Sequence, residues 1–329
     1  MALIDVIVPV YKVEAYLEKC VNSLLHQDFE DFRIVLVNDG SPDRCPQICE
    51  QFKSEYPEKI DVIHKQNGGL SDARNAGTCI SNAEFIVYVD SDDYVEPQFL
   101  SHLIQEQKRV NADIVISNAI KEFIDSDGNI VRTVVFESEP IVLNNEEALI
   151  ELCYERTFRG YAWAKLYRTD IAKKHLYPKG RLFEDVFTVY KELYESSVIS
   201  AIGCCDYHYV QRPNSIMNCS FEEKHLDLNI GVSQMANFLK ERIESKKLQQ
   251  AVSYRIVEAC HISLWRSIHS NEFKEYYKRL IPSARKELKS VLQNPRTGRE
   301  RKAVYLLMAY LPWLYRIVLR RRNCAGHTA

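Results

Sequence analysis

The strongest constraint on the fold is an alternation of short apolar runs with segments of helical periodicity in the first part of the chain. The apolar runs are rich in β-branched residues, as in strands buried on both faces, and cover Ile4–Val10, Phe32–Val37, Ile60–His64 and Phe85–Val89. Between them, apolar residues recur at helical spacing over Tyr16–Leu25, Cys45–Tyr56 and Leu70–Ile80. This alternation predicts an α/β fold with a mostly parallel, Rossmann-like sheet sandwiched by helices.

The pattern changes along the chain. A helix is expected over Gln98–Arg109, a strand over Asp113–Asn118, and a turn at Asp125–Gly128 between two β-branched runs. From about Glu222 onward the sequence turns helical. The length of 329 residues accommodates one large domain and a smaller part. We therefore expect a domain over residues 1–220, a helical region over 221–300 and a basic amphipathic tail over 301–329.

Charge and the N-terminal residues limit the class of protein. The formal net charge of −2 argues against a nucleic-acid partner bound through bulk charge. The opening MALIDVIVPVY has no cationic region before its short apolar run, unlike a signal peptide. We expect the protein to stay in the cytoplasm.

Each of the four expected strands ends in polar or turn-forming residues. These ends are Pro9–Tyr11, Asp39–Ser41, Gln66–Gly69 and Asp90–Asp93. In open parallel sheets ligands bind beyond the carboxyl ends of the strands, so the four ends should line one cleft. The crowded carboxylates of residues 90–93 could hold Mg²⁺ or Mn²⁺, although a polar turn that caps the next helix would look the same.

Four segments together resemble the family 2 glycosyltransferases. They are IVPVYKVEAYLEKCVNSLLHQ, LVNDGSPD, HKQNGGLSDARNAG and VYVDSDDYVEP, in this order within about the first 120 residues. The resemblance implies the A-type glycosyltransferase fold, with residues 1–120 as its nucleotide-sugar half and 121–220 as its acceptor half. Asn38 departs from the pattern, since many members carry an aspartate there, whereas Asp39 is retained. Neither GxGxxG after the first strand nor GxxxxGK[ST] occurs, so dinucleotide and P-loop sites lack their glycine cradle.

The resemblance also implies roles for individual residues of the first half. Pro9, Tyr11 and Glu14 would border the uridine, and Asp39 would accept a hydrogen bond from the uracil N3–H. The rest of the nucleotide site would be formed by Asn67, Arg74, Asp90 and Ser91. Asp92 would bind the divalent cation directly, with Asp90 beside it. Asp93 could equally be a helix-start residue.

Three downstream segments resemble the acceptor half of the same family: GYAWAKLYRTDI, RLFEDVFTVYKELY and YHYVQRPNSIM. The resemblance assigns Asp185 as the general base, with Glu184 beside it. Helical periodicity at Val186, Val189 and Leu193 would place both acids in the first turn of a helix; the alternative is a plain helix-start acid pair.

Four further residues of this half have candidate roles. Trp163 and Lys165 would contact the acceptor sugar, unless Trp163 is simply buried in the core. His208 and Arg212 would grip the diphosphate, unless they belong to a surface loop.

The tail has a membrane-surface composition. The apolar stretch Ala303–Leu319 is flanked by Arg and Lys, interrupted by Pro312 and Arg316, and rich in Tyr and Trp. It is short for a span of about 20 residues, which favours an amphipathic helix lying on the inner face of the cell membrane. The alternative is a terminal helix packed on the protein or on another subunit of a homo-oligomer.

The resemblance thus implies an inverting, metal-dependent enzyme that uses Mn²⁺ or Mg²⁺. It would move a hexose or N-acetylhexosamine from a UDP-sugar to a saccharide or lipid-linked saccharide in bacterial surface polysaccharide synthesis. The rival interpretations are an inactive carbohydrate- or nucleotide-binding scaffold protein and a sugar nucleotidyltransferase. The second would need a glycine-rich basic loop after the first strand, where this chain has VPVYKVEAY.

Overall fold

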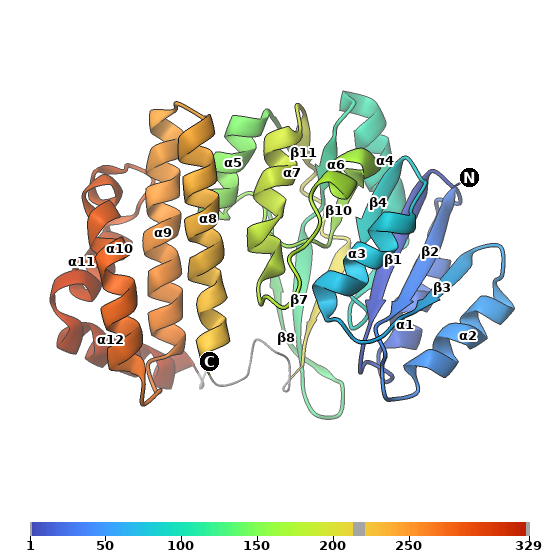
Figure 1. The fold of residues 1–329 in the computed structure, drawn as a ribbon, viewed down its shortest axis with the longest axis horizontal. Helices are drawn as coiled ribbons and strands as arrows, with labels where there is room; N and C mark the ends of the chain where they lie inside the picture. The colour runs from blue at the N-terminus through green and yellow to red at the C-terminus, as the bar shows by residue number, and fades with distance from the viewer. Residues whose placement is uncertain (1, 213–220, 327–329) are drawn as a thin grey trace. The chain divides into compact units, whose positions relative to one another are not determined.

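A computed structural model describes residues 2–212 and 221–326 of the chain. The chain divides into two compact units, residues 1–217 and 218–329 (Figure 1). The first unit holds every strand of the described residues, whereas the second is helical.

The first unit is built on an eight-stranded sheet in the order β3-β2-β1-β4-β10-β6-β11-β9. The strands β3, β2, β1 and β4 run parallel, β10 runs antiparallel between β4 and β6, and β9 is an antiparallel edge. Their bounds are β1 Ile4–Val10, β2 Phe32–Asn38, β3 Ile60–His64, β4 Phe85–Tyr88, β6 Ile114–Ile116, β9 Ile141–Leu143, β10 Lys165–Arg168 and β11 Ile199–Ala201. The mostly parallel sheet predicted from the apolar runs is confirmed.

Helices cover both faces of this sheet (Figure 1). Strand β1 is buried along its whole length. Its alternate residues Ile4, Val6, Val8 and Val10 belong to one core cluster with buried residues of α1, α2 and α4. The helices of this unit are α1 Leu17–Leu25, α2 Cys45–Glu55, α3 Leu70–Ile80, α4 Phe99–Val110, α5 Asn145–Tyr154, α6 Thr169–Lys174 and α7 Val189–Glu195.

Helix α3 packs on the opposite face of β1 through a glycine. A Cβ built on Gly77 would lie 2.5 Å from Cγ2 of Ile7, so only glycine lets the helix approach the strand this closely. The close approach positions Arg74, one turn earlier on α3, beside the end of the sheet.

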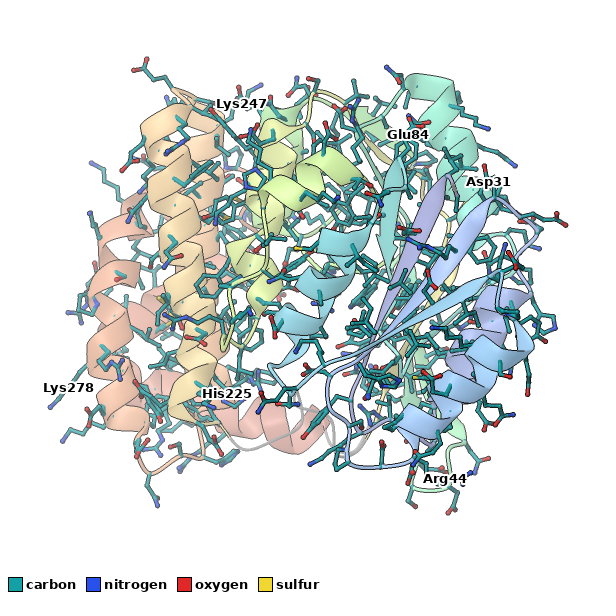
Figure 2. The ribbon with its side chains drawn as sticks, turned by 45° about the vertical axis from the view of Figure 1, so that its right-hand side comes forward. Asp31, Arg44, Glu84, His225, Lys247 and Lys278 are labelled. Atoms are coloured by element: carbon teal, nitrogen blue, oxygen red, sulfur yellow. The ribbon has the colours of Figure 1, made fainter. Side chains whose placement is uncertain are left out.

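The carboxyl ends of the parallel strands meet at one edge. The register pairs Val10 with Asn38 and Asn38 with His64, so these three strand ends are level. In Figure 2, Asp31 and Glu84, which precede β2 and β4, lie at one end of the sheet, and Arg44, which follows β2, lies at the other. The predicted functional residues therefore follow strands that end together.

A second sheet of four strands has the order β5-β12-β7-β8, with bounds β5 Tyr94–Val95, β7 Ala119–Ile124, β8 Ile130–Val135 and β12 Tyr207–Gln211. The hairpin between β7 and β8 turns at Asp125–Gly128, as predicted: the Asp125 side chain accepts hydrogen bonds from the backbone of Asp127 and Asn129. Strand β5 directly follows Asp90–Asp93 and pairs with β12. This pairing brings a strand from the end of the unit to the tip of β4.

The acid pair lies in a different kind of helix from the one predicted. Glu184–Phe187 is a 3₁₀ turn, η1, and α7 begins only at Val189. Thr188 lies between them with φ −122°, outside the helical region. The prediction of one continuous helix over this segment was wrong, because the periodic apolar residues belong to two short elements, Val186 to η1 and Val189 and Leu193 to α7.

The second unit comprises η3 Glu223–Leu226 and five α-helices among the described residues: α8 Asp227–Arg242, α9 Lys246–Arg266, α10 Phe273–Gln293, α11 Arg299–Tyr310 and α12 Pro312–Gly326. Within this unit Tyr315 of α12 bonds His261 of α9 through its hydroxyl, 2.8 Å from Nδ1. No helix among residues 2–212 and 221–326 combines the length and apolarity that a membrane span requires.

Candidate active site

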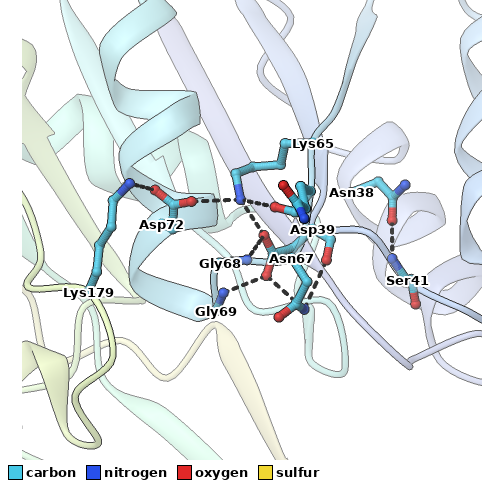
Figure 3. A network of polar contacts seen from close by, with 10 residues as sticks. Asn38, Asp39, Ser41, Lys65, Asn67, Gly68, Gly69, Asp72 and Lys179 are labelled. Atoms are coloured by element: carbon cyan, nitrogen blue, oxygen red, sulfur yellow. Dashed lines mark hydrogen bonds and ion pairs between the residues drawn. The ribbon is translucent and has the colours of Figure 1, made fainter.

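Asp39, at the end of β2, organises the loop that follows β3 (Figure 3). Its carboxylate is 2 % exposed and accepts hydrogen bonds from four groups of this loop. The donors are Lys65 Nζ at 2.5 Å, Gly69 N at 2.7 Å, Gly68 N at 2.9 Å and Asn67 Nδ2 at 3.2 Å. The structure thus brings together Asp39 and Asn67, two residues predicted for the nucleoside pocket.

Ion pairs with residues outside this loop also hold it in place. Asp72, in the first turn of α3, accepts a bond of 2.7 Å from Lys65 and is paired with Lys179 (Figure 3). Gly40 permits the close contact, since it has φ +65° and a Cβ there would lie 2.9 Å from the Asn67 nitrogen. With both Asp39 oxygens already bonded, a uracil N3–H would have to displace one of these loop donors.

The other residues predicted to border the nucleoside lie at the same edge. Pro9 is buried near the end of β1, whereas Tyr11 and Glu14 are exposed in the following turn. This turn is bonded to the one after β2: Lys12 N donates to Ser41 Oγ at 2.7 Å, and Glu14 accepts from Arg44 N at 2.9 Å. The carboxyl ends of β1, β2 and β3 therefore form one bonded edge.

Arg74 joins the two halves of the predicted site. Its guanidinium is buried, donates to Asp90 Oδ1 at 2.6 Å and also pairs with Glu184. Asp90 follows β4, and Glu184 lies in η1, 110 residues from Arg74. A charge-assisted pair on each side of one buried arginine fixes Asp90, predicted for the donor side, next to Glu184, predicted for the acceptor side.

Asp92 pairs with Arg212, whose Nη2 lies 2.5 Å from Asp92 Oδ2. The guanidinium carbon of Arg212 also lies 4.9 Å from the centre of the Tyr16 ring. Burial raises the pKa of Asp92, and the charge of Asp90 adds to this increase, while Arg212 opposes it. Ser91 is buried between the two aspartates in sequence.

The charge of this group fits a divalent cation. Four carboxyl groups, of Asp90, Asp92, Glu184 and Asp185, interact with two guanidinium groups, of Arg74 and Arg212. Oxygen ligands with excess negative charge are the donors that Mg²⁺ and Mn²⁺ prefer. Asp90 and Asp92 each keep an exposed part, 20 % and 25 % of the side chain, and so could meet a hydrated ion.

Asp93 has a structural place. Its carboxylate is 2 % exposed, accepts from the Tyr207 hydroxyl at 2.7 Å and accepts from Val210 N at 2.8 Å. Tyr207 Oη in turn accepts a bond of 3.1 Å from the backbone nitrogen of Asp90. These bonds tie the aspartate-rich turn to β12, so Asp93 positions the turn from behind.

Asp185 has the environment of a base that works near neutral pH. Burial by surrounding protein and the neighbouring charge of Glu184 raise the pKa of Asp185 to about 7, against the opposing effect of Arg74. Its Oδ1 accepts a bond of 2.8 Å from Val186 N. Asp185 as a whole residue is only partly buried, and a general base has to come within hydrogen-bond reach of the hydroxyl whose proton it takes.

Trp163 and Lys165, predicted to contact the acceptor sugar, are both buried. Trp163 is buried and stacks between Tyr161, at 4.3 Å between ring centres, and Tyr207, at 4.4 Å. The ammonium group of Lys165 is buried and donates to the backbone carbonyls of Arg159, Tyr161 and Trp163. These contacts favour roles in holding segment 159–163 over direct contact with a sugar.

The contacts of His208 do not bring it to the aspartates of residues 90–93. Its ring stacks on Tyr94 at 4.2 Å, with Nδ1 2.8 Å from Glu122 and Nε2 2.8 Å from Glu96. Both ring nitrogens therefore face carboxylates, one in β7 and one directly after β5, an arrangement that gives no support to a grip on a diphosphate. Arg212 alone of this predicted pair reaches Asp92.

Sequence reasoning missed Tyr207 and Lys65. Both lie inside motifs that the resemblance singles out, YHYVQRPNSIM and HKQNGGLSDARNAG. The alternation of side chains along a strand could have indicated the position of Tyr207, because it places Tyr207 and Tyr209 on one face of β12 and His208 on the other. Which face meets Trp163 depends on the pairing of β12 with β5, which the sequence does not reveal.

The chain is an α/β protein whose predicted site residues lie at the carboxyl ends of its parallel strands. The model of the family "Glycosyl transferase family 2" matches residues 5–176, which is more than half of the chain. The chain belongs to this glycosyltransferase family, is an enzyme of that class and has the A-type fold.

Individual relatives agree with the assignment. The chain is 29 % identical over 285 residues to the putative glycosyltransferase EpsH of Bacillus subtilis, covering 83 % of this chain and 80 % of that protein. Residues 1–349 of S. aureus TarS, solved in complex with UDP-GlcNAc, superpose with a TM-score of 0.65 and 21 % identity, covering 99 % of this chain and 92 % of that one. The mannosyltransferase PcManGT of Pyrobaculum calidifontis, solved with GDP-Man and Mn²⁺, has a TM-score of 0.52 and 13 % identity, covering 95 % and 87 %.

Proposed function

We propose that this glycosyltransferase inverts the anomeric carbon and depends on a divalent cation. It moves a hexose or N-acetylhexosamine from a UDP-sugar to a glycan or lipid-linked saccharide in bacterial surface polysaccharide synthesis. The observation that carries the proposal is the buried Arg74, which pairs with both Asp90 and Glu184. One arginine thereby joins the carboxylates assigned to the donor with those assigned to the acceptor. The surface-polysaccharide context rests on the family resemblance alone.

The donor assignment draws on two further observations. TarS, which shares the fold, binds UDP-GlcNAc, and PcManGT binds GDP-Man with Mn²⁺. In this chain Asp90 and Asp92 would hold Mn²⁺ or Mg²⁺, which when bound stabilises the charge that develops on a departing diphosphate. Arg212 would move from Asp92 to the diphosphate, since a guanidinium binds phosphate oxygens as well as carboxylates.

The chain's own groups carry the proton transfer. Asp185 takes the proton of the acceptor hydroxyl, whose oxygen forms the new bond to the anomeric carbon. The bond from that carbon to the diphosphate oxygen breaks, and UDP leaves. A single displacement of this kind inverts the carbon, so an α-linked UDP-sugar yields a β-linkage. Glu184 holds Arg74, and Arg74 lowers the pKa of Asp185.

A thermal-shift panel tests the donor. Ligands that bind only the native state raise the unfolding midpoint. UDP-glucose, UDP-galactose, their N-acetylamino forms and GDP-mannose are added with and without Mn²⁺. One UDP-sugar should raise the midpoint with Mn²⁺ and much less without it. A rise with GDP-mannose alone, or an equal rise without Mn²⁺, would contradict the donor or the metal assignment.

We also propose that the tail contacts the membrane surface. Helices α11 and α12 bury Tyr305 and Tyr315 within the second unit but expose a set of apolar side chains: Leu306, Tyr310, Leu311, Trp313 and Ile317. Trp313 is 64 % exposed and Tyr310 59 %, as suits a headgroup interface flanked by basic residues.

Flotation with liposomes tests this contact. Full-length protein should float with vesicles of anionic lipid, whereas Tyr310→Ser/Trp313→Ser should float several-fold less, since its exposed aromatics are gone. Equal flotation of both proteins would contradict the membrane contact. A size measurement of both in solution would then test the same face as a contact between subunits.

A further inference from the structure

Three side chains with metal-binding atoms lie together between α4 and the start of β12. They are His102 of α4 and, from the segment between β11 and β12, Cys204 and Asp206. Each offers one ligand atom, and the three atoms all lie within 4.8 Å of one another. Nδ1 of His102 is 2.9 Å from Oδ2 of Asp206. The fold thus gathers a nitrogen, a sulfur and an oxygen ligand from two segments that are distant in the sequence.

Backbone hydrogen bonds hold the segment that carries two of these ligands. The carbonyl oxygen of Cys204 accepts from Asn118 N at 2.7 Å and from Ser117 Oγ at 2.9 Å. The carbonyl oxygen of Asp206 accepts from Glu96 N at 2.8 Å. The third ligand extends from a regular helix. All three side chains therefore start from a fixed backbone, which favours a preformed metal site.

The mixture of ligand types favours zinc. Zn²⁺ binds thiolate, imidazole and carboxylate groups, whereas Mg²⁺ and Mn²⁺ prefer oxygen ligands alone. With bonds of about 2.0–2.3 Å to a tetrahedral ion, ligand atoms are about 3.3–3.8 Å apart. Three atoms that already lie within 4.8 Å of one another reach this spacing by side-chain shifts of about 1 Å.

The group is accessible to an ion from solution. The side chain of His102 is 37 % exposed and that of Asp206 is 12 % exposed, and Cys204 is partly buried. Within the described part of the chain the group has three members, so a tetrahedral ion would keep its fourth position for water. Closed structural zinc sites have four protein ligands, so an ion held by three should be removable by a chelator.

We propose that His102, Cys204 and Asp206 form a zinc-binding site that links α4 to the start of β12. Asp206 directly precedes Tyr207, whose hydroxyl donates to Asp93 at 2.7 Å. A zinc ion bound to Asp206 stabilises the strand that supports the aspartate-rich turn from behind. The inference goes beyond the proposed function, because this ion has no part in the transfer of the sugar.

Cobalt tests for the thiolate ligand. Protein stripped with a chelator is titrated with Co²⁺, with excess Mn²⁺ present to fill the proposed oxygen-ligand site at Asp90 and Asp92. A Co²⁺–thiolate bond absorbs strongly in the near ultraviolet, whereas Co²⁺ with oxygen ligands does not. Wild type should develop this absorption band, and added Zn²⁺, which binds such a site more tightly, should remove it. A wild-type protein without the band would overturn the proposal and leave His102 and Asp206 as an ion pair only.

Two variants and a matched control locate the ion. Cys204→Ser should abolish the band. His102→Gln should weaken Zn²⁺ binding by at least about 100-fold, because a direct ligand contributes more than the outer partners of a site do. Cys205→Ser is the control: it removes the adjacent thiol, whose sulfur lies 3.6 Å from the carbonyl oxygen of Phe136, and should keep the band and the affinity. Equal loss in Cys204→Ser and Cys205→Ser would overturn the proposal, since it would show adventitious binding by neighbouring thiols.

Alkylation gives a second measurement on the wild-type protein. A thiolate bound to zinc is a poorer nucleophile than a free one, so Zn²⁺ should slow the reaction of Cys204 with iodoacetamide by at least about tenfold. Tandem mass spectrometry separates its label from that of Cys205. Cys79, which is exposed, should react at the same rate with and without Zn²⁺. An unchanged rate at Cys204 would contradict the site.

Thermal unfolding tests the stabilising role. An ion that binds the native state raises the unfolding midpoint, so Zn²⁺ should raise it in wild type and in Cys205→Ser but not in Cys204→Ser. An equal rise in Cys204→Ser would place the stabilising ion elsewhere and overturn the proposal. None of these measurements uses a sugar donor, so a failure of the proposed glycosyl transfer and a failure of the zinc site are observed separately.

Discussion

Asp39 and Glu192 are both buried carboxyl groups in the same unit, yet their surroundings are opposite. Asp39 accepts four hydrogen bonds from the loop after β3, whereas neither oxygen of Glu192 is bonded by any group of the described residues. A buried acid of the region assigned to nucleotide recognition is thus fully bonded, whereas a buried acid near the region assigned to acceptor chemistry has two unbonded oxygens. Recognition needs a fixed shape, while proton transfer needs acids whose pKa is shifted by burial.

The largest effect should come from the acceptor side. Asp185→Asn removes the proposed base and should lower kcat by about 1,000-fold, the range of general-base catalysis. Binding of UDP and Mn²⁺, measured calorimetrically on the same preparation, should stay within about twofold. A variant that retains wild-type turnover would remove Asp185 from the mechanism.

Asp92→Asn should have the next largest effect. The loss of one proposed metal ligand should weaken Mn²⁺ binding and lower kcat by roughly 100-fold, equivalent to about 2.7 kcal/mol. Arg212→Gln is the control, because it removes the cation paired with Asp92 but leaves the carboxylate: it should bind Mn²⁺ at least as tightly as wild type. If Asp92→Asn bound Mn²⁺ as well as wild type, the metal would lie elsewhere.

On the nucleotide side, Asp39→Asn should act through the loop. The amide of asparagine would point an N–H group at loop donors that now donate to the Asp39 carboxylate. The unfolding free energy should therefore fall by about 1–3 kcal/mol, and the affinity for UDP should fall by about tenfold. Denaturant titration and calorimetry measure these losses. Asp72→Asn, which weakens a partly exposed pair with Lys65 and Lys179, is the control and should cost under about 1 kcal/mol. An equal cost in both variants would contradict the importance of the buried bonds.

Gly77→Ala tests the packing that both regions share. The added methyl group would meet Ile7 and should cost about 1–3 kcal/mol, while the better helix propensity of alanine returns about 1 kcal/mol. A net loss of about 1 kcal/mol is expected in urea unfolding. Gly298→Ala, with nothing within 4 Å of the added Cβ, should change the unfolding free energy by less than about 0.5 kcal/mol. A stabilised Gly77→Ala would show that α3 can move away from β1.

Much of the fold was readable from the sequence because its elements are locally determined. The first four strands and the helices between them follow apolar periodicity, and the turn at Asp125–Gly128 follows from its turn-forming residues. The break at Thr188 was not readable, since the helical spacing of Val186, Val189 and Leu193 continues across it.

The site was readable only in part. Motifs singled out Asp39, Asp92 and Asp185 as candidates, but the pairing of Arg74 with Glu184 spans 110 residues and depends on how β10 inserts beside β4. The burial of Glu192 was hidden for a similar reason. An acid in a segment with other acids and lysines resembles an exposed helix position, and only the packing of α7 encloses it.

The pH dependence of kcat in the wild-type enzyme tests the central claim most directly. With saturating donor, acceptor and Mn²⁺, turnover should fall below a single acid limb near pH 7, because Asp185 must lose its proton to act as base and burial places its pKa at about 7. A limb near pH 4, the value of an ordinary aspartate, or constant turnover from pH 5 to pH 8, would contradict the assignment of this buried carboxyl group as the base.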